Sequence, residues 1–127
     1  MQLSQERYGD ALVLIPVGRV DNTTTDGLRS DLQRHVASSH KNGDRLVLDF
    51  SKVDYISSVG LRVLMLAAKQ VREQGGSIVV AALQPVVREI FEISRFNLVF
   101  QCYGTVREAL GKVSANAQAA YDSAHGA

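Results

Sequence analysis

At 127 residues the chain is long enough to bury one hydrophobic core without disulfides, and we expect a single domain. Its hydrophobic share of 46% and charged share of 21% are those of an ordinary globular protein. A net charge of +1 offers no electrostatic footprint for nucleic acid or an anionic membrane. No apolar run approaches the ~18 residues of a membrane span. We therefore expect a soluble, cytoplasmic protein with no nucleic-acid or membrane partner.

The chain opens with a predicted hairpin. Residues 3–8 alternate weakly between polar and apolar side chains and suit an edge strand. Gly9 and Asp10 form a turn pair that leads into a second strand-like run, residues 11–17. Pro16 lacks a backbone N–H, so it predicts an edge position or a bulge near the end of that run.

A helix is predicted next. It begins within the threonine-rich segment 23–26, where several side chains can cap it, and it ends near Ser39. Leu28, Leu32 and Val36 recur at helical spacing and mark its buried face. An Asn-Gly-Asp turn then returns the chain to the sheet.

The most informative stretch follows directly. Residues 46–48 are a continuous apolar run typical of a buried strand, and the polar residues 49–54 predict a loop. From Val59 onward, apolar residues recur at i, i+3, i+4 and i+7, which indicates a helix with one face on a core. Ser57 and Ser58 stand just before this helix, and an N-cap is their simplest interpretation. A hydroxyl there is also exposed at the end of the helix dipole that favours an anion.

The following segments predict a parallel sheet. Residues 77–83 form a second continuous apolar run, and a strand, helix and strand in this order favour a right-handed parallel crossover. Pro85 suits the first position of a short helix. Residues 98–102 predict a last strand, in which Cys102 is expected to be a buried structural thiol.

The C-terminal part divides at about residue 113. Thr105 and Glu108 form a capping box that opens a final helix. From Ser114 the residues are small and polar, with too little apolar surface to order themselves firmly. We therefore expect a domain over residues 1–113, followed by a helical extension or disordered tail over 114–127.

The sequence D-F-S-x-V-x-Y-I-S-S-x-G-L-R-x-L at residues 49–64 resembles the STAS domain and, more closely, the free-standing anti-sigma factor antagonists. The signature of that family is a strand ending in D-x-S, followed by a hydrophobic residue, Asp, a phosphorylatable Ser, Ser or Thr, Gly and Leu. The resemblance covers residues 3–113. It implies the STAS fold, an α/β fold with a mixed, mostly parallel sheet and helices packed mainly on one face.

The family motif maps onto this chain residue by residue. Ser58 takes the position of the phosphorylatable serine, with Ser57 as second choice and Ser51 as third. Ser57 stands where the family has Asp, and Val59 stands where it has a small hydroxyl residue. The resemblance also implies a partner-binding surface, which comprises Asp21, Asp49, Ser51, Ile56, Ser57, Ser58, Val59 and Gly60.

The resemblance implies a regulatory function rather than catalysis. Family members dock on an anti-sigma factor with a GHKL-type serine kinase fold and thereby free the sigma factor. The kinase phosphorylates the serine and ends the docking, and a serine phosphatase reverses the modification. The Ser57 departure leaves an alternative open, a non-phosphorylated STAS scaffold or accessory subunit of a larger complex. A small-ligand-binding domain is a third interpretation.

Enzymatic sites find little support in the residues. No G-x-S-x-G surrounds Ser58, and the three histidines are scattered. No pair of His or Cys has chelating spacing, and no Walker A or G-x-G-x-x-G sequence occurs. We therefore expect no enzyme activity, no metal and no cofactor.

Overall fold

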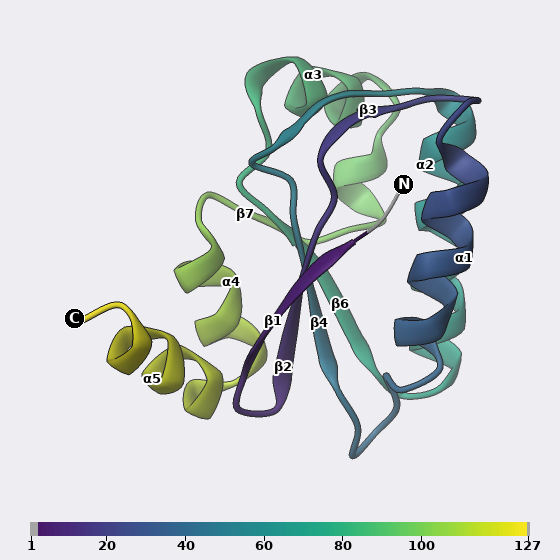
Figure 1. The fold of residues 1–127 in the computed structure, drawn as a ribbon. Helices are drawn as coiled ribbons and strands as arrows, with labels where there is room; N and C mark the ends of the chain where they lie inside the picture. Colours follow the sequence, from purple (N-terminus) through teal and green to yellow (C-terminus); the bar gives the residue numbers. More distant parts are fainter. Residues whose placement is uncertain (1–2, 127) are drawn as a thin grey trace.

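A five-stranded mixed sheet runs through the centre of the computed structural model, which describes residues 3–126 (Figure 1). Its order is β1 (Ser4–Tyr8), β2 (Ala11–Ile15), β4 (Arg45–Asp49), β6 (Ser77–Ala81) and β7 (Cys102–Tyr103). The first pair is antiparallel and the other three pairs are parallel. The sequence-based prediction of a mixed, mostly parallel sheet is therefore confirmed.

The three central strands are apolar because both of their faces are covered. Val47 lies between Val13 and Val79, and all three side chains are buried. The predicted hairpin is present, since β1 and β2 pair from Tyr8 and Ala11 outward. The edge position inferred from Pro16 is wrong, however. Strand β2 lies between β1 and β4 and simply ends at Ile15, before the residue that lacks a ladder donor.

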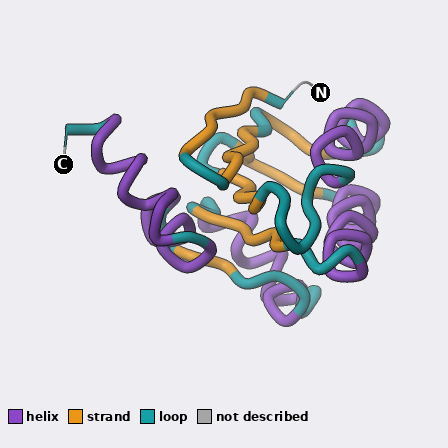
Figure 2. Tube along the Cα trace, turned by 90° about the horizontal axis from the view of Figure 1, so that it is seen from below, coloured by secondary structure: helices purple, strands orange, loops and turns teal. Residues whose placement is uncertain are grey.

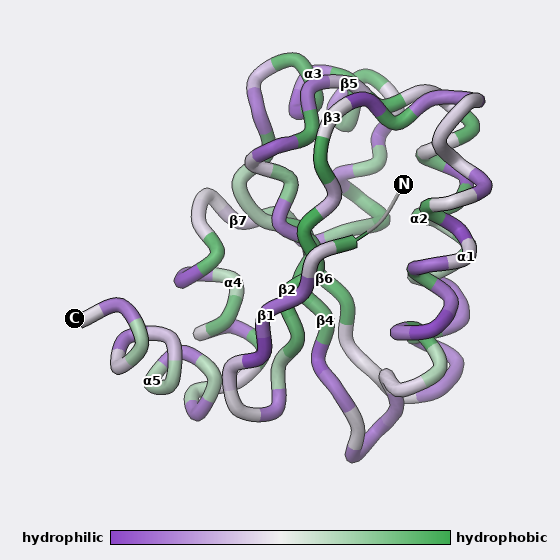
Figure 3. The backbone as a smooth tube through the Cα atoms, in the orientation of Figure 1, coloured by the Kyte–Doolittle hydropathy of each residue, from purple (hydrophilic) through white to green (hydrophobic). Residues whose placement is uncertain are grey.

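Helices cover both faces of the sheet (Figure 2). One face carries α1 (Thr25–Val36), α2 (Ser58–Glu73) and α3 (Pro85–Ile93), and the other carries α4 (Val106–Val113) and α5 (Ala115–Ala124). Strand alternation separates the two cores, since Leu46 and Leu48 pack in the first and Val47 packs in the second. Figure 3 shows the hydrophobic residues gathered along the central strands.

A second, two-stranded sheet leads into α2. Strand β3 (Gly18–Val20) pairs in parallel with β5 (Val53–Ile56), which lies within a stretch that the sequence predicts largely as polar loop. The expectation of a loop before the serines is wrong at β5. Val53 and Ile56 are buried in the core that α1, α2 and α3 cover, and pairing with β3 satisfies the backbone hydrogen-bonding groups of this segment.

The segment after α3 also differs from the prediction. Residues 96–98 form a short 3₁₀ helix, η1 (Phe96–Leu98), and the last strand begins only at Cys102. Aromatic packing explains the difference, because the Phe96 ring lies 5.4 Å from Phe91 and 5.7 Å from Phe100 between ring centroids. Cys102, predicted to be buried, is exposed, because β7 is an edge strand.

Residues 115–124, for which the sequence left a helix and disorder open, form α5. Ala117 is buried against the second core, and Tyr121 packs edge-on against Tyr8 with ring centroids 5.1 Å apart. The two oxygens of Asp122 accept from Arg107 of α4 at 2.7 and 3.0 Å. These contacts attach α5 to the β1 and α4 side of the sheet.

Candidate functional site

Ser57 and Ser58 have different structural roles where β5 leads into α2. Ser57 is the N-cap, with extended backbone angles, and its hydroxyl accepts the Gly60 N–H at 3.1 Å. Its carbonyl accepts the Leu61 N–H at 2.9 Å, which opens the helical hydrogen-bond ladder. The N-cap interpretation is therefore confirmed for Ser57. Ser58 is the first residue within the helix.

Ser58 is exposed at the helix start. Within residues 3–126 its hydroxyl makes no hydrogen bond to another residue. The adjacent Val59 is 43% exposed, and no acidic residue lies in the first turn of α2. The free amides and dipole of that turn favour a negative charge, so an anionic group on the Ser58 hydroxyl is electrostatically tolerated.

Two of the residues expected at the partner surface instead belong to the core. Ile56 is only 1% exposed, and Gly60 is buried beside it. A Cβ atom added to Gly60 would lie 2.7 Å from Val20 Cγ1 and 2.9 Å from Ile56 Cγ1. The expectation that Ile56 and Gly60 contact a partner is corrected accordingly. Their role is to bring α2 close to β3 and so to set the position of the serines.

Asp21 lies beside the start of α2, in the part of the surface called the Ser58 corner below. The Ser57 N–H donates to the carbonyl of Val20 at 2.8 Å, so the loop that follows β3 runs beside the start of α2. The Asp21 carboxylate accepts the Thr23 hydroxyl at 2.6 Å and the Thr23 N–H at 2.9 Å. It also accepts Arg19 Nε at 3.0 Å. These groups, with Thr23 the foremost, lower the pKa of Asp21 and keep it ionised.

Arg19 and Tyr55 complete this surface and were not singled out from the sequence. They are partners across β3 and β5, and the Arg19 guanidinium lies 4.0 Å above the centre of the Tyr55 ring. Arg19 thus connects Tyr55 to Asp21. A pairing that depends on two strands 36 residues apart leaves no local sequence signal, so only the fold identifies it.

Asp49 and Ser51 lie away from the Ser58 corner. Asp49 shares the strand face of Val47, and its side chain lines a cavity of about 200 Å³ with Tyr8, Tyr121 and His125. One carboxylate oxygen accepts the Ser51 N–H at 3.0 Å. Ser51 is exposed, and its carbonyl accepts Gln84 Nε2 at 2.8 Å. Strand alternation thus directs Asp49 to the α5 side of the sheet.

Residues 3–126 contain no group of three His, Cys, Asp or Glu side chains that could hold a metal ion. Of the helices that the structure describes, none combines the length and apolar character needed to cross a bilayer.

Comparison with known proteins gives the class of this domain. The STAS domain family model matches residues 2–109. BtrV of Bordetella bronchiseptica, assigned as an anti-sigma factor antagonist, is 39% identical over 100 residues, which cover 79% of this chain and 84% of BtrV. The crystal structure of an anti-sigma factor antagonist from Mycobacterium paratuberculosis has a TM-score of 0.79 at 26% identity, over 88% of this chain and 92% of that one.

A more distant structure shares the fold alone. The phosphorylated form of SpoIIAA, described as a Bacillus cell fate determinant, has a TM-score of 0.64 at 15% identity and covers 88% of this chain and 99% of its own. The chain belongs to the STAS domain family and, within it, to the anti-sigma factor antagonists.

Proposed function

We propose that this protein binds an anti-sigma factor through the corner around Ser58, and that phosphorylation of Ser58 ends the binding. The observation that carries the proposal is the free hydroxyl of Ser58, exposed at the first residue of α2 beside the exposed Val59. Relatives named as anti-sigma factor antagonists support the choice of partner. The phosphorylated form of SpoIIAA supports the idea that this fold can carry a phosphate.

Geometry favours Ser58 over Ser57 as the phosphorylated residue. The Ser57 hydroxyl already accepts the Gly60 N–H, so its modification would compete with the helix cap. The Ser58 hydroxyl makes no such hydrogen bond within residues 3–126. Ser57 also stands in place of the family's Asp, which removes a like charge beside the incoming phosphate.

A phosphate at Ser58 affects docking more than folding. It adds about 1.5–2 negative charges and three acceptor oxygens, which the amino end of α2 accommodates. A partner that covers Val59 would have to desolvate this charge. Repulsion and desolvation together suffice for about 10²-fold weaker binding, or roughly 3 kcal/mol.

The enzymes that act on this protein follow from the same proposal. The anti-sigma factor has a GHKL-type serine kinase fold and phosphorylates Ser58 with ATP, and a serine phosphatase restores the binding form. The protein is then a substrate and a ligand, while the catalytic groups belong to its partners.

The test uses the cognate anti-sigma factor of the GHKL-type kinase fold. The protein is incubated with that factor, ATP and magnesium, and its intact mass is measured. One added phosphate is expected on the unmodified sequence and none on Ser58→Ala. Ser51→Ala is the matched control, because Ser51 is also exposed but lies away from the corner.

Binding measurements complete the test. Ser58→Asp should weaken binding of the anti-sigma factor by about 10²-fold, whereas Ser58→Ala should retain it. If no phosphate is gained and Ser58→Asp binds as tightly as the unmodified protein, the switch is refuted, and a non-phosphorylated scaffold within a larger complex becomes the better account.

A further inference from the structure

Helix α2 presents a continuous outer face that begins at Ser58. At 100° per residue, positions 58, 62, 65, 66 and 69 fall on the side opposite the buried residues of the helix. The outer α2 face consists of Ser58, Val59, Arg62, Met65, Leu66 and Lys69. All six are exposed, and the three apolar members, Val59, Met65 and Leu66, are 43%, 39% and 46% exposed. A helix on a single domain normally turns polar groups to this side, so the apolar residues point to a partner.

The charge of this face is positive. Arg62 and Lys69 flank Met65 and Leu66, and within the described part of the chain neither cation makes an ion pair or side-chain hydrogen bond. Glu73, at the far end, is the one acidic residue of α2. The neighbouring helix α1 differs, since Arg29 and Arg34 pair there with Asp26 and Asp31. An apolar strip between uncompensated cations is complementary to an acidic surface with apolar residues at its centre.

Ser58 and Arg62 are four residues apart in the same helix. Side chains at this spacing are neighbours, and an anion placed four residues before a cation is the favourable orientation. A phosphate on Ser58 is therefore within reach of the Arg62 guanidinium, which can donate two parallel hydrogen bonds to it.

We infer that the outer α2 face docks on an acidic surface of the anti-sigma factor, and that a phosphate on Ser58 ends the docking by engaging Arg62. This inference rests on the proposed function and adds the chemistry of the partner and the residue through which the switch acts. The phosphate carries more charge than a partner carboxylate and is held on the same helix. It therefore competes for Arg62 while leaving a negative charge at the edge of Val59.

The first experiment needs no partner. Phosphoserine is incorporated at position 58 during translation, and its second ionisation is followed by ³¹P NMR. Because Arg62 stabilises the dianion, the pKa should lie below the usual ~6 and should rise by about 0.3 in Arg62→Gln. Lys69→Gln is the matched control, since Lys69 lies on the same face three turns away, and it should leave the pKa unchanged. Equal values in all three proteins would overturn the role of Arg62.

The second experiment measures affinity for the anti-sigma factor used above. Arg62→Glu combined with Lys69→Glu should weaken binding about 10–100-fold, and Met65→Ser with Leu66→Ser should weaken it similarly. Raising the ionic strength from about 0.05 to about 0.5 M should weaken the unmodified complex more than the charge-reversed one. Lys112→Glu on α4 and Ile93→Ser, an exposed apolar residue of α3, are the controls and should bind normally.

The outcomes separate this inference from the proposed function. Loss of binding in Ser58→Asp with normal binding in the Arg62 and Lys69 variants would refute the inference alone. Absence of both phosphorylation and binding would refute the proposed function. A dimer in light scattering that Met65→Ser dissociates would assign the face to a second copy of this chain and also overturn the inference. Finally, phosphorylation of Ser58 should weaken binding to the anti-sigma factor less in Arg62→Gln than in the protein that retains Arg62, because the two changes act on one interaction.

Discussion

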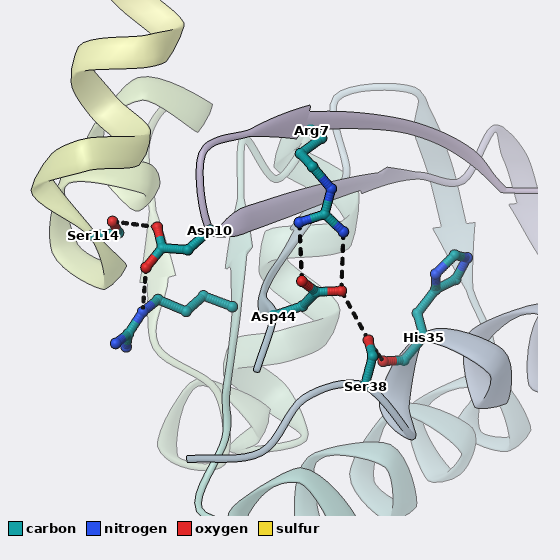
Figure 4. Close-up of polar contacts among 7 residues, drawn as sticks. Arg7, Asp10, His35, Ser38, Asp44 and Ser114 are labelled. Atoms are coloured by element: carbon teal, nitrogen blue, oxygen red, sulfur yellow. Dashed lines mark hydrogen bonds and ion pairs between the residues drawn. The ribbon is translucent and has the colours of Figure 1, made fainter. Parts of the chain in front are cut away.

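The two ends of the central sheet differ in which groups they leave exposed. At the amino ends of the parallel strands, side chains pair with one another (Figure 4). Arg7 donates to both oxygens of Asp44 at 2.9 and 3.1 Å, and the Ser38 hydroxyl lies 3.0 Å from the same carboxylate. Asp10 joins Arg45 at 3.2 Å and Ser114 at 2.5 Å, which connects the hairpin to the start of α5.

The helix ends on this side are also joined by hydrogen bonds, and we call this end of the sheet the closed end. Gln74, the C-cap residue of α2, donates to the carbonyls of Val36 and Ser39 at 2.9 and 2.8 Å, which holds the ends of α1 and α2 together. At the opposite end, the start of α2 leaves the Ser58 hydroxyl and the Val59 side chain exposed. The polar groups of the first end are paired with one another, whereas the second end, although Arg19 and Asp21 pair there, also leaves Ser58 and Val59 exposed. Changes at the first end should alter stability, whereas changes to the exposed groups of the second end, Ser58 and Val59, should alter binding.

The largest effect on stability is expected from Gly76→Ala at the closed end. A Cβ there would lie 2.4 Å from the carbonyl oxygen of Ser39 and 2.5 Å from its hydroxyl. Ser39 is fully buried, so the backbone must shift, and we expect a loss of about 1–3 kcal/mol in urea unfolding. Gly104→Ala is the control, because its added Cβ would contact only Glu108, at 3.6 Å. Equal stability of the two variants would remove the basis for calling this end closed.

A smaller loss, with a characteristic pH dependence, is expected from Asp44→Asn. Its hydrogen bond with Arg7 is the main cause that lowers the pKa of Asp44. Because the folded pKa lies below the unfolded value of about 3.9, the stabilisation is complete above that pH and is lost as the pH falls through the folded pKa. We expect a loss of about 1 kcal/mol at pH 7, since the pair is partly exposed.

Unfolding curves from pH 7 to pH 2 measure this prediction. The difference between the native protein and Asp44→Asn should shrink in acid. Asp26→Asn serves as control, because the side chain of Asp26 is 94% exposed in its pair with Arg29 and its replacement should matter little. A constant difference across the range would contradict the assignment to the Arg7 pair.

The serines allow a comparison within the open end itself. Ser57→Ala should lose about 1 kcal/mol because the Gly60 N–H loses its cap, whereas Ser58→Ala should stay within about 0.5 kcal/mol of the native protein. Ser57→Asp keeps an N-cap acceptor and should be close to native. Thermal unfolding of the three variants measures the ranking. A larger loss for Ser58→Ala than for Ser57→Ala would reverse the roles assigned to them.

The smallest effect is expected from His35→Gln near the closed end. Burial is the main cause that lowers the pKa of His35 below its usual ~6.5, so the unfolded chain takes up the proton first. The contribution of His35 to stability is therefore complete above about pH 6.5. It is lost as the pH falls from about 6.5 through the folded pKa. The effect should be about 0.5 kcal/mol or less, because the ring is only partly buried. His35→Gln should flatten this dependence between pH 7 and 5, as measured by urea unfolding.

Much of the framework was predictable because its signals are local. The apolar run at residues 46–48 and the one beginning at Ser77 predict β4 and β6, and Thr105 predicts the start of α4 through the cap that it provides to Glu108. The serine pair likewise predicts the beginning of α2. In each case the residues that decide the structure lie within one helical turn or one strand.

Other features depended on contacts between distant segments. Strand β5 forms because β3 lies beside it, and the turn at Phe96 forms because Phe91 and Phe100 pack around it. The exposure of Cys102 follows from its place at the sheet edge. For the candidate site, the motif identified Ser58, but only packing against Val20 showed that Ile56 lies inside.

The sequence alone indicated the hairpin, β4, β6, most of the helices and the beginning of α2, because hydrogen-bonded caps and apolar periodicity act over a few residues. The tertiary structure alone decided that Asp49 faces α5, that Asp21 lies beside the serines, and that the outer α2 face remains uncovered. Those outcomes depend on strand order and on which elements cover each face, and pairing between distant segments is not encoded in any single stretch of chain.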